Sequence, residues 1–198
     1  MKILKTYLSN FTLLSVFAVL ILTISSFKIE KPLPIYETEN LDTLYKPKNK
    51  EILLFYIQLS ENHNIIVYDI NYNADKTVNE KDPVHTYWIR YSESGQNKEL
   101  TYFQKNLVYG LESKLIDKEK QAYILKFVSY KKRKIYISKT GTDNKHSAYM
   151  NIQGKLSLLS KIFIEVNSGT FGLPTVKYVE LYGKEITSNK QIIERIIP

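Results

Sequence analysis

The fold is decided by residues 155–167, which read KLSLLSKIFIEVN. One set of alternating positions is mostly apolar and contains Leu156, Leu158, Ser160, Ile162, Ile164 and Val166. The other set is mostly polar and includes Lys155, Ser157, Lys161, Glu165 and Asn167. Because successive side chains of a β-strand point to opposite faces, this alternation predicts a strand with one buried face. At about 3.3 Å per residue the strand would be roughly 35 to 40 Å long, so we expect a bend or bulge near Ser160.

Nine further segments have the composition of strands. They are short, rich in tyrosine, isoleucine and valine, and separated by polar connections: residues 52–59, 64–70, 84–91, 111–116, 121–130, 133–139, 147–152, 176–182 and 191–197. Turn residues in the connections favour antiparallel hairpins. The sequence therefore predicts a mainly β fold, an antiparallel meander of about 9–10 strands that forms a barrel or a sandwich, with one short helix.

The expected helix lies between two of these strands. Leu100, Phe103 and Leu107 follow helical spacing, Asn97 is placed to cap the start, and Gly110 is placed to end the helix in a left-handed conformation. We interpret the apolar stripe as facing the core. The helix would close one end of a barrel or pack on one sheet.

The first 26 residues have the features of an export signal. Lys2 and Lys5 precede an apolar run over residues 11–24, and two serines follow it. A spanning helix needs about 20 apolar residues, so the shorter run favours a cleavable signal peptide; if it is not cleaved, the segment is an N-terminal anchor. We therefore predict an exported protein that is periplasmic, extracellular or anchored to the membrane.

The rest of the chain divides into a linker and one domain. Residues 27–50 are polar and contain Pro32, Pro34 and Pro47, which predicts a linker. Residues 51–198 have the length of a single β domain. If the N-terminal segment is retained, the linker would keep this domain close to the membrane.

The charge and composition of the chain narrow the range of partners. Without Lys2 and Lys5, the exported part has 26 basic and 20 acidic residues, a net charge of about +6. Outside the cytoplasm the expected anionic partners are lipid phosphates and acidic glycans, and we expect no nucleic acid. The alternative is a charge that serves only solubility. The chain has no cysteine, which excludes disulfides, thiolate metal ligands and cysteine nucleophiles.

The densest positive charge lies at a predicted strand junction flanked by tyrosines. It consists of Lys131, Lys132, Arg133 and Lys134. Arginine binds phosphate or carboxylate with two parallel hydrogen bonds, and lysines add attraction, so an anionic ligand can dock here. Lysines beside an edge strand also prevent sheets from aggregating, and this explanation needs no ligand.

The loop after the second strand has the spacing of an EF-hand calcium loop. Positions 1, 3, 5, 7, 9 and 12 are Asp69, Asn71, Asn73, Asp75, Thr77 and Glu80. However, Ala74 stands where the sharp turn normally needs glycine, and the flanking segments are predicted strands rather than helices. The alternative is an ordinary hairpin loop rich in asparagine and aspartate.

A third candidate site lies on the predicted strand over residues 84–91. Alternation places His85 and Tyr87 on one face and Arg90 on the other, with bulky residues on both. The three side chains are weak catalytic candidates, with histidine as a proton carrier and tyrosine as a hydrogen-bond donor. The alternative is an aromatic core layer with Arg90 reaching the surface.

Two classes of function remain. The preferred class is a non-catalytic exported domain of the bacterial envelope that binds an anionic glycan, a lipid or a small amphipathic ligand. It would need no cofactor, with calcium as the one candidate ion. The alternative class is an envelope enzyme that acts on a glycan or lipid through His85, Tyr87 and Arg90, with Asp69 from another strand as a further candidate. No complete catalytic motif is present, and the three histidines are too far apart in sequence to form a ligand pair.

Several motifs together resemble a known family. They are Phe55-Tyr56-Ile57-Gln58, residues 83–91, Tyr109-Gly110, residues 127–133 and Val176-Lys177-Tyr178-Val179-Glu180. The chain resembles an exported bacterial domain catalogued as domain of unknown function family 4833, over nearly all of residues 51–198. The resemblance implies the domain, but it implies no activity, cofactor or catalytic residue.

Overall fold

The computed structural model describes most of the predicted domain and little of the chain before it. The described residues are 28–29, 45–60, 63–140, 145–168 and 174–197. The predicted signal peptide and residues 30–44 of the predicted linker lie outside these ranges. Within them, no helix is both long enough and apolar enough to cross a membrane.

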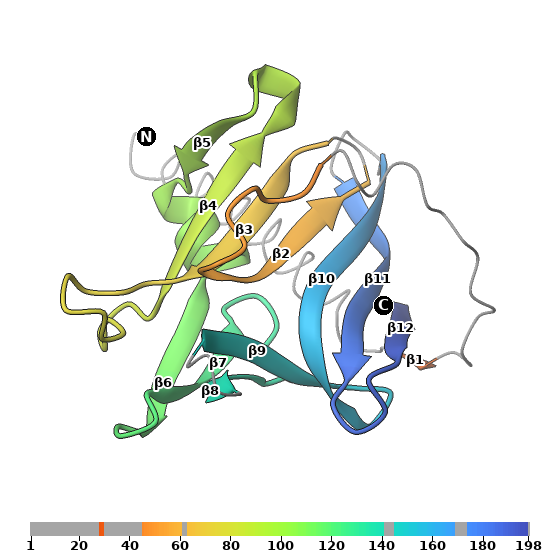
Figure 1. The fold of residues 1–198 in the computed structure, drawn as a ribbon. Helices are drawn as coiled ribbons and strands as arrows, with labels where there is room; N and C mark the ends of the chain where they lie inside the picture. The colour runs from red at the N-terminus through yellow and green to blue at the C-terminus, as the bar shows by residue number, and fades with distance from the viewer. Residues whose placement is uncertain (1–27, 30–44, 61–62, 141–144, 169–173, 198) are drawn as a thin grey trace, which may run out of the picture.

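The described chain is mainly β, as predicted, and its strands form one curled, half-barrel sheet (Figure 1). The twelve strands are β1 (Lys28–Ile29), β2 (Leu53–Leu59), β3 (Ile65–Ile70), β4 (Val84–Arg90), β5 (Gln96–Glu99), β6 (Leu111–Asp117), β7 (Ala122–Phe127), β8 (Ile135–Thr140), β9 (Lys145–Ile152), β10 (Lys155–Ser168), β11 (Pro174–Glu185) and β12 (Gln191–Ile197). Each of the predicted segments overlaps one strand, and β1 and β5 are additional.

The sheet consists of two meanders joined by β10. Strands β2 to β5 pair in sequence order as antiparallel neighbours, and so do β6 to β9. The first part of β10 pairs with β9 and the later part with β2, while β11 runs along the other edge of β10. In Figure 1, β10 is the long strand that runs between the two meanders.

One strand pair departs from the predicted antiparallel meander. Strands β10 and β2 run parallel, with Lys161 opposite Tyr56 and Ile164 opposite Leu59. Two parallel strands must be joined by a long connection, and the chain between β2 and β10 includes the whole second meander. The alternation along each strand predicts the strands and hairpins, but it does not specify which distant strand completes the sheet.

The bulge predicted in the long strand is present. The pairing of β10 with β11 shifts register between Leu159 and Lys161, so Ser160 is the extra residue. An extra residue reverses the alternation, so Leu159 faces the core before the bulge and Ile162 faces it afterwards. The prediction of one continuous apolar face is therefore wrong for the first half of the strand, where Leu156 is exposed.

The main hydrophobic core lies inside the curl and takes side chains from both meanders and from β10 to β12. The rings of Phe55 and Tyr68 stack with centroids 4.4 Å apart, and Phe127 meets both of them edge-on. The Tyr68 hydroxyl donates a hydrogen bond to the Tyr109 carbonyl at 2.8 Å. This bond connects the core to the helical segment before β6, which covers residues 102–108.

A second cluster covers the opposite face of β2, β3 and β4. It contains Tyr56, Ile65, Val67, Tyr87 and Ile89. The chain segment before β2 crosses the sheet near this face (Figure 1), and Pro47 in that segment is buried. Tyr45 stacks on His63 at 4.2 Å and meets Tyr91 edge-on at 5.2 Å. The end of the predicted linker therefore packs against the domain.

The predicted helix is present in a shorter form. Residues 102–108 are helical, and η2 (Gln104–Val108) has the wider hydrogen bonding of a π-helix, in which the Tyr109 N–H donates to the Gln104 carbonyl. The predicted cap, Asn97, lies in β5, and Gly110 is not in the left-handed region. The only other helical element in the described ranges is η1 (Tyr91–Glu93), a single 3-10 turn.

The predicted core-facing stripe of this helix is confirmed for Leu100 and wrong for Phe103 and Leu107. Leu100 and Tyr109 pack against the main core, but Phe103 and Leu107 are exposed. The stripe assumed 3.6 residues per turn, whereas π-type bonding joins residues five apart and turns other side chains inward. Gln104 takes the inward position instead, and its side-chain carbonyl accepts a 3.4 Å hydrogen bond from the Trp88 indole.

Candidate functional site

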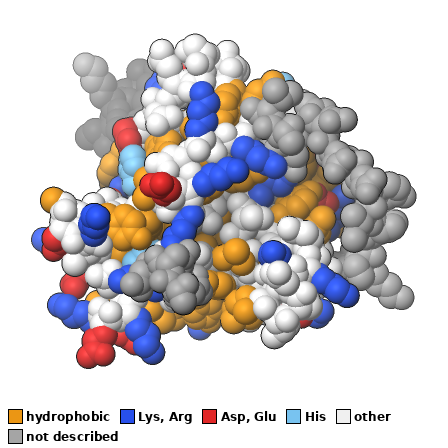
Figure 2. Space-filling model, in the orientation of Figure 1, with side chains coloured by type: hydrophobic (Ala, Val, Ile, Leu, Met, Phe, Trp, Pro, Cys, Tyr) orange, Lys and Arg blue, Asp and Glu red, His pale blue; other side chains and the backbone are white. Residues whose placement is uncertain are grey.

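The basic turn, defined as residues 131–134, connects β7 to β8. Lys131, Lys132 and Lys134 are exposed there, and the Lys131 ammonium pairs with Glu112 on β6. On the face of the molecule in Figure 2, by contrast, Lys and Arg side chains are scattered among apolar and acidic ones. The net charge of the chain alone therefore does not define a site, and the basic turn is the densest run of positive charge along the sequence.

Arg133 has a different role from its three neighbours. Its Nη1 donates to Glu194 Oε2 at 2.9 Å and to the Asn151 carbonyl at 3.1 Å, and its Nη2 donates to the other oxygen of Glu194. Glu194 is only 2% exposed and also accepts a 2.8 Å bond from the Gln153 N–H. Arg133, which the sequence predicted to be a ligand-binding residue, is therefore held inside the fold and fixes the basic turn to β12.

An apolar surface lies next to the basic turn. We use this term for four exposed side chains of the helical segment: Tyr102, Phe103, Leu107 and Val108, which are 77%, 68%, 44% and 36% exposed. The rings of Tyr102 and Phe103 meet edge-on with centroids 6.0 Å apart. Exposed aromatic side chains in a contiguous group are typical of an interaction surface rather than of ordinary solvent-exposed positions.

Two hydrogen bonds place the apolar surface beside the basic turn. The Ser129 hydroxyl donates to the Val108 carbonyl at 2.6 Å, and the Val128 N–H donates to the Gly110 carbonyl at 3.0 Å. Residues 128–130 lead directly into the basic turn. The C-terminal end of the helical segment and the start of the turn are thus neighbours in space.

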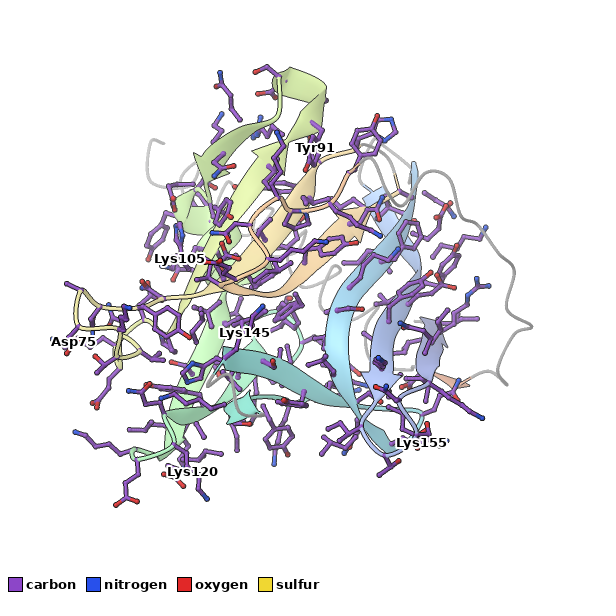
Figure 3. All side chains as sticks on the ribbon, viewed as in Figure 1. Asp75, Tyr91, Lys105, Lys120, Lys145 and Lys155 are labelled. Atoms are coloured by element: carbon purple, nitrogen blue, oxygen red, sulfur yellow. The ribbon has the colours of Figure 1, made fainter. Side chains whose placement is uncertain are left out.

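Two more lysines lie on the helical segment and on the strand β5. Lys105 belongs to η2 and forms an ion pair of 3.3 Å with Asp82; Figure 3 labels it beside β4. Lys98 is exposed on β5 and lies opposite Trp88, so both side chains are on the face where Trp88 contacts Gln104 of η2. Lysines are therefore present on the helical segment, on β5 and in the basic turn next to Val108.

A small cavity lies beside η2, with a volume of about 60 Å³. Its wall includes Lys81, Asp82, Lys105, Thr86 and Ser113. Thr86 alternates with His85 and Tyr87 along β4, so the cavity opens on the opposite face of the sheet from those two side chains.

The catalytic candidates are only partly brought together. His85 Nε2 lies 2.9 Å from Glu99 Oε1, the His85 ring stacks on Tyr87 at 4.9 Å, and the Tyr87 hydroxyl donates to Asp69 Oδ2 at 2.8 Å. Arg90 lies at the other end of β4, where it bonds Glu93 at 2.6 Å. Asp69 on β3, which the sequence offered as a further candidate for this site, is one of these partners. Glu99 was not predicted, because it comes from the neighbouring strand β5.

The geometry of this group favours a structural role. Tyr87 and Asp69 are buried, and burial raises the pKa of both side chains. The hydrogen bond from Tyr87 and the nearby His85 partly oppose this rise for Asp69. Exposed His85 is paired with exposed Glu99, and the cavity beside η2 lies on the other face of the sheet. Arg90 is too far along the strand to complete the predicted site.

The predicted calcium-loop residues face several different partners. Asn71 donates to the Asp82 carbonyl at 2.8 Å, Asn73 bonds Thr77 at 3.0 Å, and Glu80 forms an ion pair of 3.2 Å with Lys118. Asp75 lies at the outer tip of the loop (Figure 3), where its carboxylate accepts the Thr77 N–H at 2.9 Å. In the described ranges, no three His, Asp or Glu side chains gather as a metal site requires. Calcium binding by this loop stays a prediction.

His146 on β9 is a buried histidine that the sequence pattern did not single out. Its Nδ1 lies 2.8 Å from the Tyr72 hydroxyl, which connects the loop after β3 to β9. Burial lowers the pKa of the imidazole, and the nearby Lys139 lowers it further. Nothing in the local sequence indicates this contact, because the two partners are 74 residues apart.

We expect His146 to make the stability of the protein depend on pH. Because the pKa is lower in the folded state, the unfolded state binds the proton first as the pH falls below its unfolded value of about 6.5. The free energy of unfolding should then decrease by up to about 1.4 kcal/mol per pH unit until the pH reaches the folded pKa. Urea unfolding at several pH values between 5 and 7.5 checks this, and His146→Gln should remove most of the decrease. An unchanged slope in that variant would contradict the assignment to His146.

The fold and the surface together define a mainly β domain with a fixed basic turn beside an exposed apolar helix. The family model described as Domain of unknown function (DUF4833) matches residues 55–195, and the chain belongs to this family. The resemblance predicted from the sequence motifs is thus confirmed. No curated protein and no solved structure matches the chain.

Proposed function

We propose that the protein is an exported, non-catalytic domain that binds an anionic component of the bacterial envelope through the basic turn. One observation carries this proposal: the buried pair of Arg133 and Glu194 fixes the turn, so that Lys131, Lys132 and Lys134 are presented from a rigid support. A turn whose backbone is already fixed loses little backbone freedom on binding, which favours affinity for a polyanion.

The N-terminal segment and the charge of the chain are consistent with this proposal. A signal peptide or anchor would bring the domain to a compartment where the abundant anions are lipid phosphates and acidic glycans. The pair of His85 and Glu99 gives no comparable support for an enzyme, because both side chains are exposed and Arg90 lies elsewhere on β4.

The charge-reversal variant Lys132→Glu/Lys134→Glu tests the proposal. Each lysine near an anionic surface contributes about 1 kcal/mol, so we expect the double variant to bind immobilised heparin, used as a model polyanion, at least tenfold more weakly. The measurement is the salt concentration at which the full chain elutes from the heparin column. Ion pairing with an extended polyanion is salt-dependent, so weaker binding should lower this concentration.

The matched control is Lys118→Glu/Lys120→Glu, which changes the net charge by the same amount. These two lysines are highly exposed in the turn between β6 and β7, at the opposite end of β7 from the basic turn; Figure 3 labels Lys120 there. We expect a clearly smaller change in elution. Equal changes in the two variants would show a response to net charge alone and would overturn the proposal.

A further inference from the structure

We propose that the anionic component is a lipid surface and that the apolar surface of the helical segment inserts into it. This inference rests on the proposed function, since it names the partner that the basic turn meets. The residues involved are the four apolar side chains of residues 102–108, together with Lys98, Lys105 and the lysines of the basic turn.

The first argument is the chemistry of the exposed side chains. Tyr102 and Phe103 are the two most exposed large hydrophobic residues in the described ranges. An aromatic ring with a polar edge is favoured at the boundary between lipid and water, and phenylalanine and leucine bury their apolar surface below it. A soluble anionic polymer would give Phe103 and Leu107 no reason to be exposed.

The second argument is the size of the apolar surface. The exposed fractions of its four side chains add up to little more than two complete side chains, which is roughly 500 Å² at most. A stable interface between two folded proteins buries about 800 Å² on each partner. A lipid surface needs no matching partner shape, so a small group of aromatic and aliphatic side chains is sufficient when charges assist it.

The third argument is charge complementarity. Lys105 belongs to the helical segment itself, Lys98 lies on β5 opposite Trp88, and the basic turn begins next to Val108. Lysine side chains can lie along an apolar surface while their ammonium groups meet lipid phosphates. The apolar surface and the lysines can therefore contact the same membrane surface together.

The fourth argument is that the helical segment is held firmly in this exposed arrangement. Tyr109 packs its ring edge-on against Trp88 at 5.4 Å, and its carbonyl accepts the Tyr68 hydroxyl. The inward contacts of the segment are thus made by Tyr109, Gln104 and Leu100, so the exposed side chains do not need to leave the core before they meet a membrane.

A fluorescent reporter on the helical segment tests the inference in the full chain. The chain contains no cysteine, so Asn106→Cys introduces a unique site for a polarity-sensitive dye on the exposed helical segment. We expect the emission to shift to shorter wavelength with vesicles of phosphatidylcholine mixed with phosphatidylglycerol. Vesicles of phosphatidylcholine alone should give a much smaller shift. A reporter at Glu119→Cys, in the turn with the control lysines, should not respond even if the N-terminal segment enters the bilayer.

The variant Phe103→Ser/Leu107→Ser separates this inference from the proposed function. Both side chains are exposed, so the fold should be retained. We expect the variant to lose most of the emission shift at position 106 and to keep the heparin elution of the unchanged protein. An undiminished shift, or equal shifts with both kinds of vesicle, would overturn lipid insertion assisted by the lysines. No shift, with heparin binding still dependent on Lys132 and Lys134, would overturn the lipid inference and leave the proposed function intact.

Discussion

Replacing Glu194 with alanine is expected to lower the free energy of unfolding by about 3–5 kcal/mol. The carboxylate of Glu194 is almost fully buried and accepts hydrogen bonds from Arg133 and from the Gln153 N–H. Its removal leaves a partly buried guanidinium without its counter-charge and a backbone donor without its acceptor. Urea unfolding of the variant and of the unchanged protein gives the difference.

Two control variants distinguish the buried ion pair from ordinary surface charge. Glu112→Ala removes the exposed partner of Lys131 and should change the free energy of unfolding by less than about 1 kcal/mol. The double replacement Arg133→Met/Glu194→Leu removes both charges and fills similar volume, so it should recover most of the stability lost in Glu194→Ala. If Glu194→Ala proves no more destabilising than Glu112→Ala, the ion pair does not fix the basic turn.

The same ion pair shows why the role of Arg133 could not be predicted from the sequence. In the sequence, Arg133 stands among three lysines, and a run of four basic residues is typical of an exposed surface. Its partner Glu194 is 61 residues away and belongs to β12, which is also predicted as a strand. No local pattern distinguishes a glutamate that faces the core from one that faces solvent when the partner charge comes from another part of the sheet.

The strands themselves were predictable because half-buried β-strands alternate apolar and polar side chains. Strand β5 was missed because Gln96 to Glu99 are exposed and contain no apolar residue. The bulge of β10 near Ser160 was predicted, but the faces of the residues before it were not, because their reversal depends on where the extra residue is inserted. Sequence alternation thus predicts the presence of a strand more reliably than it predicts the direction of each side chain.

Of the two parts of the candidate site, only the basic turn could be predicted from the sequence. The basic turn is a local cluster in the sequence. Of the apolar surface, Phe103 and Leu107 were predicted to face the core because they were assigned to an α-helix, and Tyr102 and Val108 were not singled out. The π-type bond between Tyr109 and Gln104 changed which side chains point inward. Sequence spacing does not reveal such a bond, because it depends on how Tyr109 and Gly110 fit against the core and β7.

Replacing Gly110 with alanine is expected to destabilise the protein by about 3 kcal/mol or more, because the helical segment has no space for a side chain there. A Cβ atom at Gly110 would lie 1.7 Å from the Lys105 carbonyl oxygen and 2.8 Å from its carbonyl carbon. Both atoms belong to the backbone of η2, so the clash can be relieved only by moving the segment away from the core. Thermal unfolding of the two proteins measures the loss.

Gly154→Ala provides the matched control, because it separates steric overlap from backbone strain. Gly154 has a φ of +77° in the turn between β9 and β10, and a Cβ atom there would meet nothing within 4 Å. Its replacement should therefore destabilise the protein only by the strain of a left-handed alanine, about 1–2 kcal/mol. Gly110 has no such strain, so a larger loss in Gly110→Ala must come from displacing η2.

That displacement should also weaken the vesicle-dependent emission shift at position 106, whereas Gly154→Ala should leave the shift unchanged. Equal losses of stability in the two variants would show that η2 can move aside easily, and it would then not hold the apolar surface in place.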